Sequence, residues 1–369
     1  MCTTGNAQDR GAASTDGRAR DGAAARVSAR RLGPLSVVAV GCVLGAVLLS
    51  AGRSDRVTRL ESRVAPSGVA PSGAVQAAPA SGRRRAVLVP LARPHALASF
   101  LAPPLPGEGV WRPAGRLVGG QVALYTTTLR LPDAPATLAG VAWMDPRLLR
   151  ATLYSGSLSP GGLFWHHTAP ISPVAARSLV AAFAGGFLIK DSEGGYLSEG
   201  HLVAPLRAGA ASLVIYKDGT ATVGEWGRDV SMTPAVVAVR QNLRLLVDHG
   251  HPVAGLDPAD TSVWGFSLGA VPNTPRSALG VTADGALVYV SGPMTIVDLA
   301  RVLVRAGAVR AMVLDMNPLW PVFSSYTPST PGGEATPANG VDLLPTMEQS
   351  PARFFELAYA RDFVTMSAR

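Results

Sequence analysis

Short apolar runs separated by turn residues dominate the long C-terminal part of the chain. Residues 121–131, 138–143 and 150–155 are rich in valine, leucine, tyrosine and threonine. Such runs, bounded by glycine, proline and polar turn residues, are typical of β-strands. We therefore expect strands over these three ranges.

Two Asp-Gly dipeptides lie between further strand-like runs. Asp218-Gly219 separates residues 211–216 from 220–226, and Asp284-Gly285 separates a second pair of runs. Asp-Gly between alternating apolar runs is the strongest short-range signal for a β-hairpin. Both pairs are therefore predicted to be hairpins.

Helical periodicity is clearest directly after the second hairpin. The apolar positions Ile296, Leu299 and Leu303 recur at helical spacing, so one face of this helix is apolar. Thr295 precedes them as a capping residue, and we expect the helix to end at Gly307.

The apolar run 309–314 follows, and its composition fits a strand buried on both faces. It places Asp315 at its carboxyl end, where a fold holds a carboxylate rigidly. A strand-end residue that caps the next loop is the structural alternative.

A second helix is predicted to start at Ser172-Pro173 and to run to about residue 182. Gly185-Gly186 follows it. Hairpins with few helices predict an α+β domain, strand-rich with mixed or antiparallel sheets. A doubly wound sheet would need more alternating helices.

The N-terminal part of the chain has a different pattern. Residues 1–32 are rich in alanine, glycine, serine and arginine, which predicts a disordered segment. Residues 33–52 carry no charge, and 20 such residues are enough for one transmembrane helix. Residues 53–85 are a linker rich in proline, alanine and glycine, followed by the large domain at 86–369.

The apolar segment predicts how the domain is located. A full-length span favours an uncleaved single-pass anchor with the C-terminal domain outside the cytoplasm; cleavage as a signal peptide and secretion is the alternative. The formal charge of the chain is +8, but residues 1–100 hold 14 arginines against five acids. The domain is therefore near neutral, which argues against nucleic acid as a partner. The only cysteines are Cys2 and Cys42, so the domain has neither a disulfide framework nor a cysteine-based zinc site.

Several motifs occur in the order found in one known family. Residues 276–280 (RSALG), the Asp-Gly hairpin, the amphipathic helix and residues 311–315 (AMVLD) follow one another, and residues 182–187 (AFAGGF) precede them. This pattern, over roughly residues 107–369, resembles the phosphodiester glycosidase family, which includes the uncovering enzyme for mannose 6-phosphate signals. The resemblance implies a hydrolase of glycosyl-phosphate linkages, with Gly185 and Gly186 at its substrate site.

The chain departs from the family pattern at two places. Ala184 stands where the family has asparagine, and Met316-Asn317-Pro318 stands where it has a run of glycines and serine. Asparagine offers a hydrogen-bond donor and an acceptor, and alanine offers neither. The departures bear on activity more than on fold.

Glycosyl-phosphate cleavage needs an acid for the leaving group, a base or nucleophile opposite, and cations for the phosphate. We predict Asp315 and Glu199 as the catalytic carboxylates. The predicted substrate-binding residues, with Gly185 and Gly186, are Arg276 as phosphate fork, Arg240, and Asn317. No cofactor or metal is expected.

Two other chemistries are open from the sequence. Residues 265–269 (GFSLG) match the serine-hydrolase elbow at Ser267, but no histidine follows in the chain. His249 and His251 beside Asp248, with a contribution from residues 166–167, are candidate metal ligands; a polar surface loop is the structural alternative.

The sequence therefore predicts a membrane-anchored, extracytoplasmic hydrolase that acts on glycosyl-phosphate linkages in surface or exported glycans. The alternative function is a catalytically inactive envelope glycan-binding or structural protein of the same fold. The missing asparagine at Ala184 is compatible with that alternative.

Overall fold

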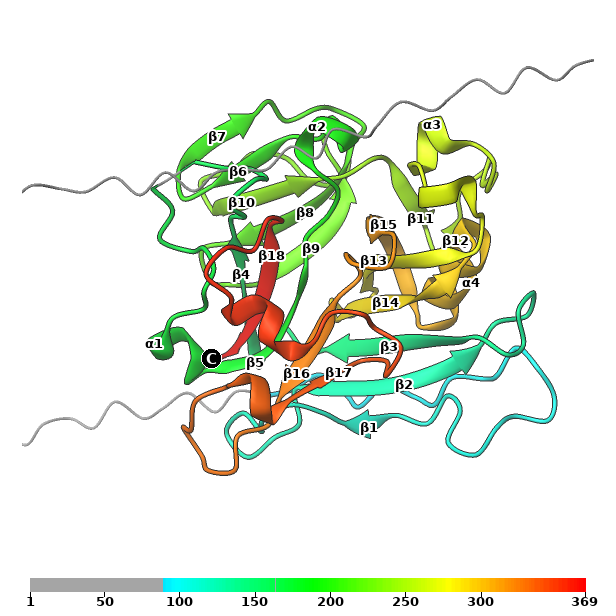
Figure 1. The fold of residues 1–369 in the computed structure, drawn as a ribbon, viewed down its shortest axis with the longest axis horizontal. Helices are drawn as coiled ribbons and strands as arrows, with labels where there is room; N and C mark the ends of the chain where they lie inside the picture. Colours follow the sequence, from blue (N-terminus) through cyan, green and yellow to red (C-terminus); the bar gives the residue numbers. More distant parts are fainter. Residues whose placement is uncertain (1–88, 163) are drawn as a thin grey trace, which may run out of the picture. The chain divides into compact units, whose positions relative to one another are not determined.

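The computed structural model describes residues 89–162 and 164–369. This part of the chain is strand-rich, with antiparallel sheets and few helices, as the sequence predicts (Figure 1). The predicted disordered segment, transmembrane helix and linker, at 1–32, 33–52 and 53–85, lie outside the described residues. Among the described residues, no helix has the length and apolar character needed to cross a membrane.

The largest sheet has eight strands in the order β1-β2-β3-β14-β13-β15-β11-β12, and all its neighbouring pairs are antiparallel. Its strands are β1 (Arg112–Pro113), β2 (Leu124–Arg130), β3 (Leu138–Met144), β11 (Leu245–Asp248), β12 (His251–Pro252), β13 (Thr274–Thr282), β14 (Leu287–Met294) and β15 (Ala308–Met316).

Two five-stranded antiparallel sheets complete the strand framework. One has the order β7-β6-β10-β8-β9 and the other β17-β16-β5-β18-β4. The first contains β6 (Tyr196–Ser198), β7 (His201–Ala204), β8 (Ala211–Tyr216), β9 (Ala221–Glu225) and β10 (Val236–Gln241). The second contains β4 (Leu149–Tyr154), β5 (Leu179–Ala184), β16 (Phe323–Tyr326), β17 (Gly340–Asp342) and β18 (Phe363–Ala368).

The longest helix of the described residues is α4 (Ile296–Arg305), which contacts β13, β14 and β15 of the largest sheet. The other helical segments are α1 (Pro173–Ala176), α2 (Ile189–Ser192), α3 (Thr261–Trp264) and the 3₁₀ turns η1 (Leu268–Ala270), η2 (Pro337–Asn339) and η3 (Pro351–Phe355).

Apolar side chains form separate clusters on the two faces of the largest sheet. Leu299 and Leu303 of α4 pack with Val313 of β15 in one cluster. Leu314 of β15 packs with Phe183 of β5 in another, which also includes residues of the smaller sheets. Strand β15 is therefore buried on both faces, which explains its continuous apolar sequence.

The local predictions for the hairpins and for the longest helix are confirmed. Strands β8 and β9 pair around Asp218-Gly219, and β13 and β14 pair around Asp284-Gly285. Thr295 caps α4, because its side chain accepts the backbone N–H of Asp298 at 3.1 Å.

The predicted helix from Ser172 to about residue 182 is wrong. Ser172 caps only α1, a helix of four residues, and residues 179–184 form the strand β5. This strand lies between β16 and β18, and all six of its side chains are buried. Pairing on both edges and burial on both faces override the helix preference of its alanines.

Candidate functional site

Gly185 and Gly186 follow β5 at a point where the backbone passes close to charged side chains. Gly185 donates its N–H to the carbonyl of Asp362 at 2.8 Å. A Cβ at Gly185 would lie 2.1 Å from Asp362 Oδ2, and one at Gly186 would lie 3.1 Å from Arg240 Nη2. The two glycines therefore permit a close approach that a side chain at Gly185 would block.

Arg240, the predicted substrate-binding arginine of β10, forms a fully buried ion pair. Its Nε donates to Asp362 Oδ2 at 2.9 Å, and neither side chain is exposed to solvent. The guanidinium also donates to the carbonyl oxygens of Phe187 and Gln241. Arg240 thus links β10 to the segment after β5 and to the residue before β18.

Asp315 lies in β15 and is 1% exposed. Its Oδ1 accepts the backbone N–H of Met316 at 2.8 Å, and its Oδ2 lies 3.7 Å from Arg361 Nη1. Burial raises the pKa of Asp315 to about 8, against the opposing effect of the Arg361 charge. The carboxyl group is therefore mostly protonated at neutral pH.

Arg361 connects this carboxyl group to the surface. It is 7% exposed, and its guanidinium carbon lies 4.3 Å from the ring centre of Trp320. The charges of Arg240 and Asp362 also act on Asp315, which shows that the four side chains form one group. We call Asp315, Arg361, Asp362 and Arg240 the buried charged cluster.

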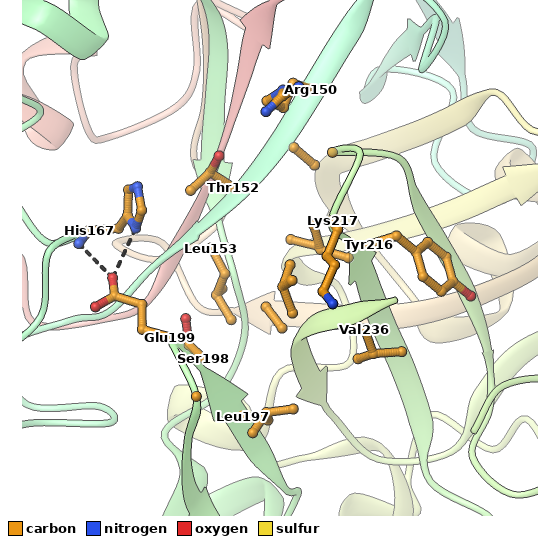
Figure 2. Close-up of a pocket in the computed structure, with 16 residues that line it drawn as sticks. Arg150, Thr152, Leu153, His167, Leu197, Ser198, Glu199, Tyr216, Lys217 and Val236 are labelled. Carbon is orange, nitrogen blue, oxygen red and sulfur yellow. Dashed lines mark hydrogen bonds and ion pairs between the residues drawn. The ribbon is translucent and has the colours of Figure 1, made fainter. Parts of the chain in front are cut away.

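Glu199, the second predicted carboxylate, lies elsewhere, in the turn between β6 and β7. It lines a cavity of about 630 Å³ together with His167, Lys217 and Arg150 (Figure 2). Asp315 does not line this cavity. The structure therefore does not bring the two predicted catalytic carboxylates to one site.

The carboxylate of Glu199 is held by two neighbouring histidines. It accepts the backbone N–H groups of His166 and His167 at 2.9 and 2.7 Å and contacts both ring Nδ1 atoms at 3.2 and 2.9 Å. Burial acts to raise the pKa of Glu199, but these hydrogen bonds outweigh it and lower the pKa. Glu199 is therefore an ionised carboxylate with its oxygens already occupied.

Arg276 and Asn317 lie on the strands next to Asp315. Arg276 pairs with Met316 across β13 and β15, and its Nε donates to the carbonyl of Met294 at 3.1 Å. Within the described residues, no hydrogen bond or ion pair joins it to Asp315. Burial lowers the pKa of Arg276 to about 10.

Asn317 has a left-handed backbone, with φ of 74°. Its Oδ1 accepts the N–H of Leu268 at 2.7 Å, and its own N–H donates to the carbonyl of Pro275 at 2.9 Å. The side chain thus fixes the turn that follows β15. Its predicted role in binding substrate would use the amide nitrogen.

The geometry at Ser267 does not match a nucleophile elbow. Ser267 precedes the short turn η1, and its hydroxyl donates to the carbonyl of Val271 at 2.8 Å. At the other candidate site, His249 Nε2 lies 3.9 Å from Asp248 Oδ1. In the described part of the chain, no three histidine, cysteine, aspartate or glutamate side chains group as metal ligands.

Sequence reasoning missed Arg361, Asp362 and the neighbouring Tyr359. Asp362 directly precedes β18, which pairs with β5, so this pairing brings Asp362 to Gly185. An ionisable dipeptide before a buried strand was the available signal. Nothing local in the sequence indicates that this strand pairs with a strand some 180 residues earlier.

Comparison with known proteins identifies the class of domain to which this geometry belongs. Residues 177–315 match the family model of the phosphodiester glycosidases. The resemblance inferred from the sequence motifs is confirmed over that range, which includes Gly185, Gly186, Arg240 and Asp315. Arg361 and Asp362 lie beyond it. No curated protein sequence matches the chain significantly.

Solved structures with similar folds come from three organisms. The catalytic domain of zebrafish N-acetylglucosamine-1-phosphodiester alpha-N-acetylglucosaminidase, auto-inhibited by its pro-peptide, is 16% identical with a TM-score of 0.43, covering 70% of this chain and 88% of that one. A hypothetical protein from Synechocystis is 12% identical with a TM-score of 0.38, covering 70% and 64%. A protein of Burkholderia pseudomallei described as exported is 15% identical with a TM-score of 0.33, covering 62% and 74%.

Proposed function

We propose that this chain is a membrane-anchored, extracytoplasmic hydrolase that cleaves glycosyl-phosphate linkages in surface or exported glycans. In this reaction water splits the bond between the anomeric carbon and the bridging oxygen, which yields a free sugar and a phosphate monoester. The match of residues 177–315 to phosphodiester glycosidases supports the type of reaction. The uncharged segment 33–52 supports the location.

The observation that carries the proposal is the state of Asp315 inside the buried charged cluster. Its carboxyl group is protonated at neutral pH because burial raises its pKa to about 8. A carboxylic acid that keeps its proton at neutral pH is suited to protonate a leaving group. Asp315 also lies beside Arg361, whose positive charge complements a phosphate.

The test is turnover of synthetic sugar 1-phosphate methyl diesters by the full chain, with released sugar measured by chromatography. Asp315→Asn keeps the size of the side chain but has no proton to donate as an acid. We expect at least about a hundredfold loss of kcat, which is typical when a general acid is removed. The matched control is Asp284→Asn, in the exposed turn between β13 and β14, which should retain full turnover.

Full activity of Asp315→Asn would remove Asp315 from the mechanism. Glu199→Gln is measured in the same assay, because Glu199 was the predicted partner of Asp315 but lies in a separate cavity. Equal losses in both variants would support the predicted carboxylate pair. Unchanged turnover in Glu199→Gln would place the second group within the buried charged cluster.

A second candidate function is glycan binding without cleavage, or a structural role in the envelope. It is favoured by the separation of Glu199 from Asp315 and by Ala184 in place of the family's asparagine. This function predicts retention of the chain on an immobilised envelope glycan together with no release of sugar. Release of sugar that depends on Asp315 would exclude it.

A further inference from the structure

Several polar atoms around Asp315 are buried without a hydrogen-bond partner in the described structure. They include Asp315 Oδ2, Arg361 Nη1 and Tyr359 Oη. A buried polar group that makes no hydrogen bond carries the full penalty for losing water. Such groups are rare in folded proteins, and several in one place indicate that another molecule completes their hydrogen bonding.

These three atoms belong to one site. Arg361 Nη1 lies 3.7 Å from Asp315 Oδ2, which is too long for a hydrogen bond between them. Burial and then the charge of Asp315 raise the pKa of Tyr359, so the phenol lies near this carboxyl group and keeps its proton. At neutral pH all three groups are donors: a guanidinium, a phenol and a protonated carboxyl.

The charge of the site favours a monoanion. Arg240 and Asp362 neutralise each other in their ion pair at 2.9 Å. Asp315 is mostly neutral because burial raises its pKa to about 8, so the positive charge of Arg361 is left unbalanced. A single negative charge with several acceptor oxygens would satisfy both the charge and the three donors.

We propose that Arg361, Tyr359 and Asp315 form a binding site for the phosphate group of a phosphodiester. A phosphodiester carries one negative charge and two free oxygens, which fits one guanidinium and two neutral donors. Asp362 Oδ1 is also buried without a partner and accepts a hydroxyl of the attached sugar. This inference rests on the proposed function and assigns the phosphate to Arg361 where the sequence pointed to Arg276.

The ligand enters from the side of Trp320. The indole ring lies over the Arg361 guanidinium, and Trp320 itself is only partly buried. Its N–H donates to the carbonyl of Asn317 at 3.2 Å, which closes the turn after β15. Movement of this one side chain uncovers the guanidinium without disturbing the β-sheets.

Binding is measured by calorimetric titration of the full chain in detergent with dimethyl phosphate at pH 6.5. Trimethyl phosphate has nearly the same shape and no charge, so it serves as the control ligand. Inorganic phosphate separates free phosphate from a diester as the ligand. We expect saturable binding of dimethyl phosphate and none of trimethyl phosphate.

Arg361→Gln should weaken binding at least about tenfold, because it removes a charge-assisted hydrogen bond. The matched control is Arg244→Gln, which removes an arginine that lies 4.8 Å from the ring of Trp264, outside the cluster. If Arg361→Gln does not fold by thermal melting, Arg361→Lys keeps the charge with a different donor geometry and should also weaken binding. Asp315→Asn keeps a donor and should retain it.

Three results would overturn the inference. Absence of saturable binding would mean that buried water alone satisfies these atoms, and an equal effect in Arg244→Gln would mean that the anion binds to surface charge. Binding of inorganic phosphate but not of dimethyl phosphate would exclude the diester. Binding that depends on Arg361 without turnover would support the inference and exclude the hydrolase, whereas turnover with no effect of Arg361→Gln on binding would do the reverse.

Discussion

At the scale of single residues, the protonation of Asp315 couples the stability of the domain to pH. Its pKa is raised to about 8 in the folded protein, against an ordinary value near 4 in the unfolded chain. Between these values the folded protein holds a proton that the unfolded chain has lost. Stability is therefore greatest at low pH within this window and falls as the pH rises.

We expect the free energy of unfolding to decrease by about 1.4 kcal/mol per pH unit for one such group. Asp315→Asn removes this group, so its slope between pH 5 and 7 should be shallower than that of the wild type. The raised pKa of Asp362 acts in the same direction and remains in the variant. Urea unfolding at pH 5, 6 and 7 measures both slopes, and equal slopes would show that Asp315 is ionised in the folded protein.

At the scale of elements, the cap of α4 is the clearest local device that the sequence predicts. Thr295 Oγ1 accepts the N–H of Asp298 at 3.1 Å and also lies 3.0 Å from Asp298 Oδ2. Thr295→Ala should cost about 1 kcal/mol of unfolding free energy. Thr295→Ser keeps the hydroxyl and should lose only a few tenths, and urea unfolding of both variants measures the difference. Equal losses would assign the effect to the threonine methyl group instead of the cap.

The elements that the sequence predicts well are those whose signals are local. The Asp-Gly hairpins and the capped helix α4 each depend on residues within a few positions of one another. Strand β5 could not be predicted in this way, because its structure depends on pairing with β16 and β18 far along the chain.

The same limit applies to the candidate site. Asp315 was found because a carboxylate ends a buried apolar run, and Gly185 and Gly186 were found through the family motif. Arg361 and Asp362 reach them only through the pairing of β18 with β5. Glu199 is close to Gly186 in sequence, but the β6–β7 turn directs its carboxylate to His166 and His167.

At the scale of the whole molecule, the proposed location rests on sequence that lies outside the described residues. The basic excess is concentrated in residues 1–100, and the uncharged segment 33–52 separates a basic leader from a linker. A helix of this length and composition inserts stably into a bilayer. Anchoring and export would bring the domain to glycans at the cell surface, where a glycosyl-phosphate hydrolase would act.

The prediction for this scale is that the full chain partitions into the membrane fraction and resists extraction by high salt but not by detergent. Deletion of residues 33–52 should release it, whereas deletion of residues 64–82 in the linker should not, because only the first removes the apolar segment. Protease added to intact cells should digest the domain if it faces outward. A soluble exported product that begins after the apolar segment would instead show that this segment is a cleaved signal, and the hydrolase would then act on glycans without a tether.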